Sequence, residues 1–107
     1  HAGSATRPWM LPIYPPDAEA ELIQAAQFYE RSVPTLGAQF LDAADRAITV
    51  IQEAPARWSI IEIDVRRYLM PRFPYAIYDR ALPDQIRVLA FKHHSRHPAY
   101  WRHRLTD

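Results

Sequence analysis

The stretch that decides the fold spans residues 70–101 and reads M-P-R-F-P-Y-A-I-Y-D-R-A-L-P-D-Q-I-R-V-L-A-F-K-H-H-S-R-H-P-A-Y-W. Residues 75–80 and 85–91 are rich in β-forming side chains and are separated by the turn sequence A-L-P-D, so we expect them to pair as an antiparallel hairpin. Pro71 and Pro74 bracket the two residues between them, which predicts a tight reversal immediately before the hairpin.

The second strand of this hairpin should lie in the centre of the sheet, because both of its faces are largely apolar. The expected faces are Ile86, Val88 and Ala90 on one side and Arg87, Leu89 and Phe91 on the other. Helices should therefore cover one of the two faces.

Upstream of the hairpin, the sequence predicts two amphipathic helices. Pro15 and Pro16 are followed by acidic residues, which favours a helix start, so the first helix should span residues 17–32. The second should span residues 37–54 and end before Pro55. A link this short makes the two helices an antiparallel hairpin. From the helical spacing of the apolar residues, we expect Leu22, Phe40, Ile48 and Leu89 to be buried between helices and sheet, and Glu21, Gln24 and Glu30 to face solvent.

The rest of the chain completes a small α+β domain. Residues 9–14 can form one strand, but Pro12 lacks an amide donor, so this strand should lie at a sheet edge. Residues 58–63 and 67–70 read as extended structure, and residues 99–105 as one or two helical turns. The expected fold has an N-terminal strand, an antiparallel two-helix hairpin, a three-stranded antiparallel meander with the helices on one sheet face, and a short C-terminal helical tail.

Length and composition limit the possible classes of protein. The 107 residues suit a single domain, residues 1–107, in which residues 1–6 read as the end of an affinity tag and its linker. The chain is 49% hydrophobic and 23% charged, as in ordinary globular proteins. No apolar run approaches the roughly 18 residues of a membrane-spanning helix, so we expect no membrane contact. The absence of cysteine fits a reducing compartment.

The net charge of +1 hides a strong asymmetry along the chain. Up to Asp64 there are four arginines against nine acidic residues, whereas from Val65 onward there are nine basic residues against three acidic ones. The positive charge is concentrated near the C-terminus, where residues 85–106 contain no carboxylate and four of the five histidines. Such a segment suits a polyanionic partner.

The residues at the end of the second strand could carry chemistry on nucleic acid. Cleaving RNA without a metal needs proton-transfer groups, which His94 and His97 can supply, and cations on the phosphate, which Lys92 and Arg96 can supply. Tyr100 or Trp101 could stack a base. A metal site is not expected, because Lys92 and Arg96 place positive charge where the ion would sit. The alternative is that the aromatic rings cover the core edge and the charged residues form a solvated face.

The motifs R-F-P-Y-A-I-Y at residues 72–78 and H-S-R-H-P-A-Y-W at residues 94–101, together with the order of elements, resemble the RelE/ParE superfamily of bacterial type II toxin-antitoxin toxins. The resemblance covers about residues 11–105. It implies a small α+β domain in the cytoplasm that inhibits growth unless a cognate acidic antitoxin is bound. We expect no cofactor and no metal.

The superfamily has two branches, and the resemblance leaves both open for this chain. One branch cuts messenger RNA on the ribosome, and the other poisons DNA gyrase. For the cutting branch, the resemblance implies catalytic roles for His94, Arg96 and Tyr100, and contacts to nucleic acid from Arg66, Arg67, Arg72 and Lys92. Ala76 stands where that branch is expected to have a basic residue. A third possibility is a non-toxic interaction module that keeps the fold and antitoxin binding.

Overall fold

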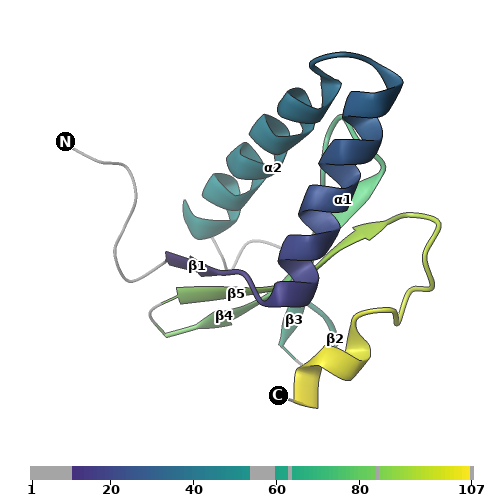
Figure 1. Cartoon of the computed structure of the whole chain (residues 1–107). Helices are drawn as coiled ribbons and strands as arrows, with labels where there is room; N and C mark the ends of the chain where they lie inside the picture. Colours follow the sequence, from purple (N-terminus) through teal and green to yellow (C-terminus); the bar gives the residue numbers. More distant parts are fainter. Residues whose placement is uncertain (1–10, 54–59, 63, 84, 107) are drawn as a thin grey trace, which may run out of the picture.

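Two antiparallel helices pack on one face of a five-stranded sheet (Figure 1). The structure, a computed structural model, describes residues 11–53, 60–62, 64–83 and 85–106. Its elements are β1 (Leu11–Ile13), α1 (Pro16–Ser32), α2 (Leu36–Glu53), β2 (Ile60–Glu62), β3 (Val65–Leu69), β4 (Tyr75–Leu82), β5 (Gln85–His93) and the 3₁₀ helix η3 (Arg102–Thr106). The predicted α+β class is confirmed. The interpretation of residues 1–6 as a tag and linker lies outside the described residues.

The strands are ordered β1-β5-β4-β3-β2 across the sheet. β5 is central, as predicted, and pairs in parallel with β1 and antiparallel with β4. The predicted three-stranded meander is wrong in number, because β2 and β3 are separate strands and the meander has four. Asp64, just before β3, lies in a turn, and its carboxylate accepts two hydrogen bonds of 3.0 Å from Arg80. These bonds lower the pKa of Asp64.

The helix hairpin closes through a short link that is capped by one carboxylate. Pro16 and the acidic residues of the first turn start α1, in agreement with the sequence. In the link, Thr35 has a left-handed φ of 71°. The Glu30 carboxylate accepts the backbone N–H groups of Thr35 and Gly37, each at 2.9 Å, and so satisfies donors at the start of α2.

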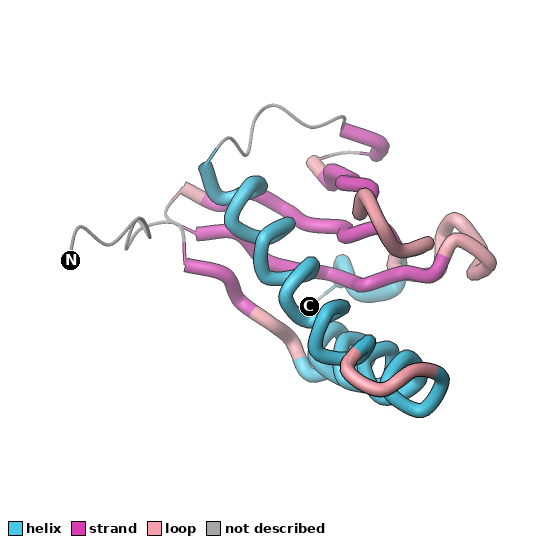
Figure 2. Tube along the Cα trace, turned by 90° about the horizontal axis from the view of Figure 1, so that it is seen from above, coloured by secondary structure: helices cyan, strands magenta, loops and turns pink. Residues whose placement is uncertain are grey.

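Gly37 sets the closeness of the two helices at this end of the hairpin. A Cβ atom at this position would lie 2.5 Å from the backbone oxygen of Ala26. Only glycine permits this approach. The view from above shows α2 crossing the strands obliquely beside α1 (Figure 2).

The main core lies between the helices and the sheet. Phe40 is completely buried and Ile48 is buried as predicted, whereas Leu22 is only partly buried against the same cluster. The Phe40 ring lies 5.1–5.3 Å, between ring centroids, from Tyr29, Phe73 and Tyr75. The reversal predicted at Pro71 and Pro74 brings Phe73 into this aromatic group and is closed by a hydrogen bond from the Met70 N–H to the Tyr75 carbonyl.

A β-bulge at Leu89 changes the predicted faces of β5. Tyr78 pairs with Ala90 and Asp79 pairs with Val88, so Leu89 is an extra residue without an opposite partner. After the bulge the alternation reverses, and Phe91 joins Ile86 and Val88 on the helix side. The predictions that Leu89 shares a face with Phe91, and that Leu89 is buried under the helices, are therefore wrong.

A second, smaller core lies on the opposite side of the sheet. It contains Leu89 and Ala90 together with Val65, Ala76, Tyr78 and Trp101. The Trp101 ring lies 5.5 Å from the Tyr78 ring and is buried. The C-terminal segment thus covers part of the sheet face that the helices leave open, and η3 begins at Arg102, three residues later than the predicted helical tail.

Candidate functional site

The end of β5, the loop that follows it and α1 enclose a cleft of about 510 Å³, here called the terminal cleft. α1 contributes Gln24 and Phe28 to its lining, and the strands contribute Tyr75 and His93. The loop after β5 contributes Arg96 and Tyr100. The cleft therefore combines aromatic walls with groups that can carry positive charge.

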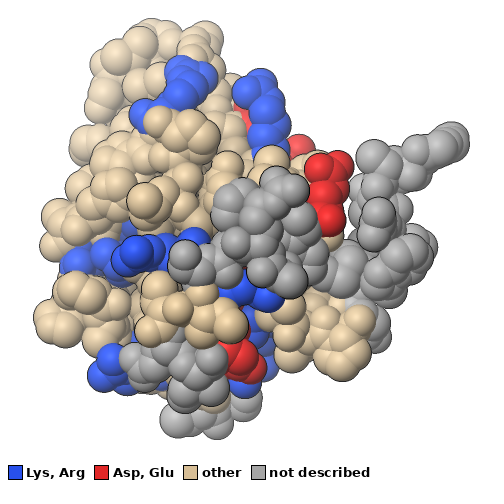
Figure 3. Space-filling model, turned by 180° about the vertical axis from the view of Figure 1, so that it is seen from behind, with Lys and Arg blue, Asp and Glu red and all other residues tan. Residues whose placement is uncertain are grey.

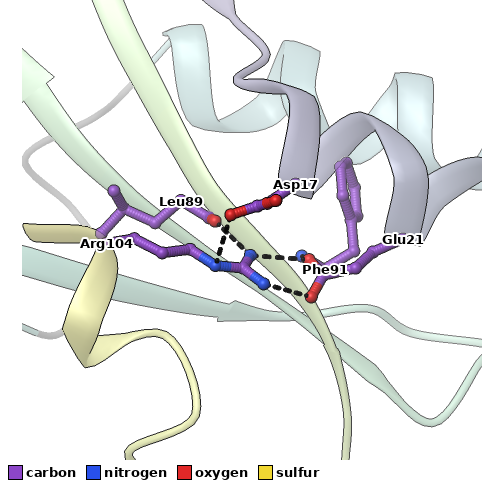
Figure 4. Close-up of polar contacts among 5 residues, drawn as sticks. All are labelled: Asp17, Glu21, Leu89, Phe91 and Arg104. Atoms are coloured by element: carbon purple, nitrogen blue, oxygen red, sulfur yellow. Dashed lines mark hydrogen bonds and ion pairs between the residues drawn. The ribbon is translucent and has the colours of Figure 1, made fainter. Parts of the chain in front are cut away.

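An ion-pair cluster fixes the C-terminal segment to α1 and to the edge of β5 (Figure 4). Two guanidinium nitrogens of Arg104 bond the Glu21 carboxylate at 3.0 and 2.9 Å, and Arg104 also donates to the Leu89 carbonyl at 2.8 Å. Asp17 adds an ion pair of 3.6 Å to Arg104. Glu21 in turn accepts the Phe91 N–H at 3.1 Å.

The position of this cluster follows from the sheet. β1 pairs with β5 only at residues 85–87, so the outer edge of β5 beyond Arg87 has backbone groups that β1 does not bond. Glu21 and Arg104 supply the missing partners for Phe91 and Leu89. The expectation that Glu21 faces solvent is wrong, because its side chain is only 13% exposed. Helical spacing gave no sign of this pairing.

Tyr100 is held by the same cluster. Two guanidinium groups lie over its ring, that of Arg96 at 5.5 Å and that of Arg104 at 5.0 Å from the ring centroid. A hydrogen bond to Glu21, followed by burial, raises the pKa of Tyr100, and the charge of Arg104 opposes the shift. The phenol is therefore a weaker proton donor than an exposed tyrosine.

The histidines at the end of β5 and in the loop after it differ in their positions and contacts. His93 lines the terminal cleft, where its Nδ1 accepts the Ser95 N–H at 3.0 Å and its ring lies edge-on to Tyr75 at 5.1 Å. His97 likewise accepts the Ala99 N–H at 3.0 Å through Nδ1. His94 is exposed and is not among the residues that line the cleft. The structure thus brings Arg96 and Tyr100 together with His93, which the sequence reasoning did not single out, rather than with His94.

Lys92 lies inside the fold rather than on a basic surface. It is 5% exposed, and its Nζ donates to the carbonyls of His93 and Arg96 at 3.3 and 3.2 Å. Burial, followed by the charge of Arg67, lowers the pKa of Lys92. Its ammonium group therefore holds the turn after β5 in place.

The three predicted arginines occupy different environments. Arg67 is exposed on β3, and Arg72 is exposed and donates to Gln39 Oε1 at 3.0 Å. Arg66 is 7% exposed and forms an ion pair of 3.3 Å with the fully buried Asp79. Burial raises the pKa of Asp79 to about 6, and the opposing effect of Arg66 is smaller.

The raised pKa of Asp79 predicts that the stability of the protein depends on pH. Its folded pKa of about 6 lies above the roughly 3.9 of an exposed aspartate, so the folded protein binds the proton more tightly than the unfolded chain. The stabilisation from this group is complete below about pH 4 and is lost as the pH rises through about 6.

We expect the free energy of unfolding of the wild type, relative to Asp79→Asn, to fall by about 2 kcal/mol between about pH 4 and pH 7. Urea denaturation of both proteins at several pH values measures this difference. A difference that stays constant with pH would contradict the assignment.

Positive charge is visible across the molecule as well as at the cleft. In the view from behind, Lys and Arg side chains form a band across the surface, and acidic side chains are fewer there (Figure 3). Among the described residues, no three His, Cys, Asp or Glu side chains gather as metal ligands would. The helices that the structure describes are too short or too polar to cross a membrane.

Comparison with known proteins rests on the fold. The sequence matches no protein-family model, and a comparison with curated protein sequences found no match. Among solved structures, the chain is similar to a chain of the chromosomal ParDE TA system from P. aeruginosa, with a TM-score of 0.69 and 15% sequence identity. The similarity covers 81% of this chain and 98% of that chain. This protein therefore shares the α+β fold of that chain, in agreement with the fold that the resemblance of its two motifs implied.

Proposed function

We propose that this protein is the toxin of a type II toxin-antitoxin pair, which an acidic antitoxin neutralises and which arrests growth by inhibiting DNA gyrase. The observation that carries the proposal is the fold, which is shared with a chain of a ParDE TA system over nearly the whole length of that chain. The family resemblance of the two motifs supports it independently. Both the toxin and its target belong to the cytoplasm.

The choice of gyrase over RNA rests on the side chains that a nuclease would need. Lys92 bonds two backbone carbonyls, and Arg66 bonds Asp79, so neither cation is available to a phosphate group in this structure. The raised pKa of Tyr100 makes its phenol a poor proton donor. Ala76 is buried where the cutting branch has a basic residue. A mechanism based on binding does not require these groups.

A metal-independent ribonuclease is the second candidate, and one observation favours it. His93, Arg96 and Tyr100 line the same cleft, where an imidazole could transfer a proton and a guanidinium could stabilise a phosphorane. In this mechanism Arg67, Arg72 and His94, all exposed, would contact the RNA. The nuclease would then use His93 where the sequence suggested His94.

Expression without the antitoxin, followed by parallel assays, distinguishes these functions. A gyrase inhibitor should arrest growth, leave messenger RNA intact and block supercoiling by purified gyrase. A ribonuclease should cut messenger RNA early, in the presence of EDTA as well, and Tyr100→Phe should slow it by roughly ten- to a thousandfold. Unimpaired growth with well-folded protein would reject both and favour the non-toxic interaction module.

A further inference from the structure

α1 presents a second face, separate from the one that packs into the core. Ala18, Ala25 and Ala26 are buried, whereas Gln24 and Phe28, one turn apart, line the terminal cleft. Phe28 is 56% exposed, which is unusual for a side chain of this size. The helix therefore directs an uncovered aromatic ring towards the cleft.

Phe28 belongs to a series of neighbouring aromatic rings, of which Phe28, Tyr75 and His93 form an aromatic wall of the cleft. Its ring lies 5.5 Å from Tyr29, which lies 6.3 Å from Tyr75. Tyr75 in turn lies 5.1 Å from His93. This wall offers a contact surface for an apolar side chain of a partner, and burying Phe28 there would remove apolar surface from water.

The charge available at the cleft is positive. Among the described residues that line it, Glu21 is the only carboxylate, and it is already bonded by Arg104 and by the Phe91 N–H. Arg96 also lines the cleft and is exposed, with its guanidinium over the Tyr100 ring. No carboxylate of the described residues forms an ion pair with Arg96. A partner with an acidic group would provide it.

We infer that the terminal cleft is the docking site of an acidic segment of the antitoxin, in which an apolar side chain packs on Phe28 and Tyr75 and a neighbouring carboxylate pairs with Arg96. The existence of this partner rests on the proposed function. The location and chemistry of the contact rest on the exposed ring, the uncompensated guanidinium and the cleft between them. A bound segment would also cover His93 and Tyr100.

The test uses the protein product of the adjacent gene as the probe and measures its affinity by titration calorimetry. Phe28→Asp should weaken binding at least 100-fold, because it removes an apolar anchor and adds a charge that repels the acidic segment. Val33→Asp is the matched control, since Val33 directly follows α1, is 52% exposed and does not line the cleft. It should leave the affinity unchanged.

Gln24 provides a charge test at a single position that is exposed and should tolerate substitution. Gln24→Glu should weaken binding about tenfold and Gln24→Lys should not, because only the first repels an acidic segment. The loss of affinity caused by Gln24→Glu should diminish at high salt. Melting curves of each variant establish that it is folded, and the Gln24 pair keeps the test valid if Phe28→Asp does not fold.

The outcomes separate this inference from the proposed function. If the wild type binds the neighbouring gene product and is neutralised by it, while the Phe28 and Gln24 variants bind equally well, the toxin assignment stands and the docking site is wrong. If the Gln24 pair alters binding of a single-stranded RNA but not of that protein, the cleft is a nucleic-acid site and the inference fails. If the wild type binds no such protein, both the proposed function and the inference fail.

Discussion

Replacing Phe40 with alanine should lower the free energy of unfolding by about 3–5 kcal/mol, a large part of the stability of a domain of this size. Phe40 is completely buried, and its ring touches the rings of Tyr29, Phe73 and Tyr75. The substitution removes the transfer energy of the ring and leaves a cavity that three other rigid rings cannot easily fill. It also removes the contact between α2 and the reversal that precedes β4.

Phe28→Ala is the matched control, because it makes the same change on a ring that is 56% exposed. It should alter stability by no more than about 0.5 kcal/mol. Urea denaturation gives both values, provided that the slope with denaturant does not change. Similar losses for the two variants would mean that the helix faces are wrongly assigned.

Replacing Arg104 with methionine should destabilise the protein by about 3 kcal/mol or more, because breaking a largely buried ion pair leaves an uncompensated charge. The Glu21 side chain is 13% exposed and that of Arg104 is 11% exposed. Methionine keeps much of the length and packing of the arginine, but the Glu21 carboxylate and the Leu89 carbonyl lose their partner. Arg46→Met, an exposed position on α2, should change stability very little.

A double-mutant cycle separates the ion pair from general packing. Glu21→Gln combined with Arg104→Met should cost less than the sum of the single changes, because the double variant no longer buries an unpaired charge. Hydrogen exchange gives a local measure, since the Phe91 N–H donates to Glu21 and should exchange faster in Glu21→Ala. Additive effects with unchanged Phe91 exchange would argue against the cluster.

The sequence predicted those parts of the fold that depend on local signals. Proline pairs and helical spacing located both helices to within a residue, and the turn before Gln85 identified the central hairpin. The β-bulge was not predictable in this way, because Leu89 is as apolar as the residues that flank it and a period of two has no marker for an extra residue. Its effect was to place Leu89 on the opposite face from the one expected.

Of the candidate site, the sequence located the region but not the partners. Arg96 and Tyr100 do meet at one cleft, whereas His94 does not line it and His93 does. Lys92 is buried because it bonds two backbone carbonyls, and Arg66 is buried because it pairs with Asp79 on the neighbouring strand. Residue type alone does not reveal either partner. Glu21 and Arg104 are 83 residues apart in the sequence, so their pairing required the folded structure.

The bonds from Glu21 and Arg104 to β5 also bear on how this protein avoids self-association. An open strand edge presents unpaired amide and carbonyl groups that recruit strands from other molecules, and central strands rich in apolar residues are the most hazardous. Two long charged side chains occupy the groups of Leu89 and Phe91 that an incoming strand would need. At the opposite edge of the sheet lies β2, which is three residues long. Ile60 and Ile61 of this strand are exposed, but so short a strand gives an incoming strand few groups to pair with. Charged side chains therefore oppose aggregation at the β5 edge of the sheet, and the short length of β2 opposes it at the other edge.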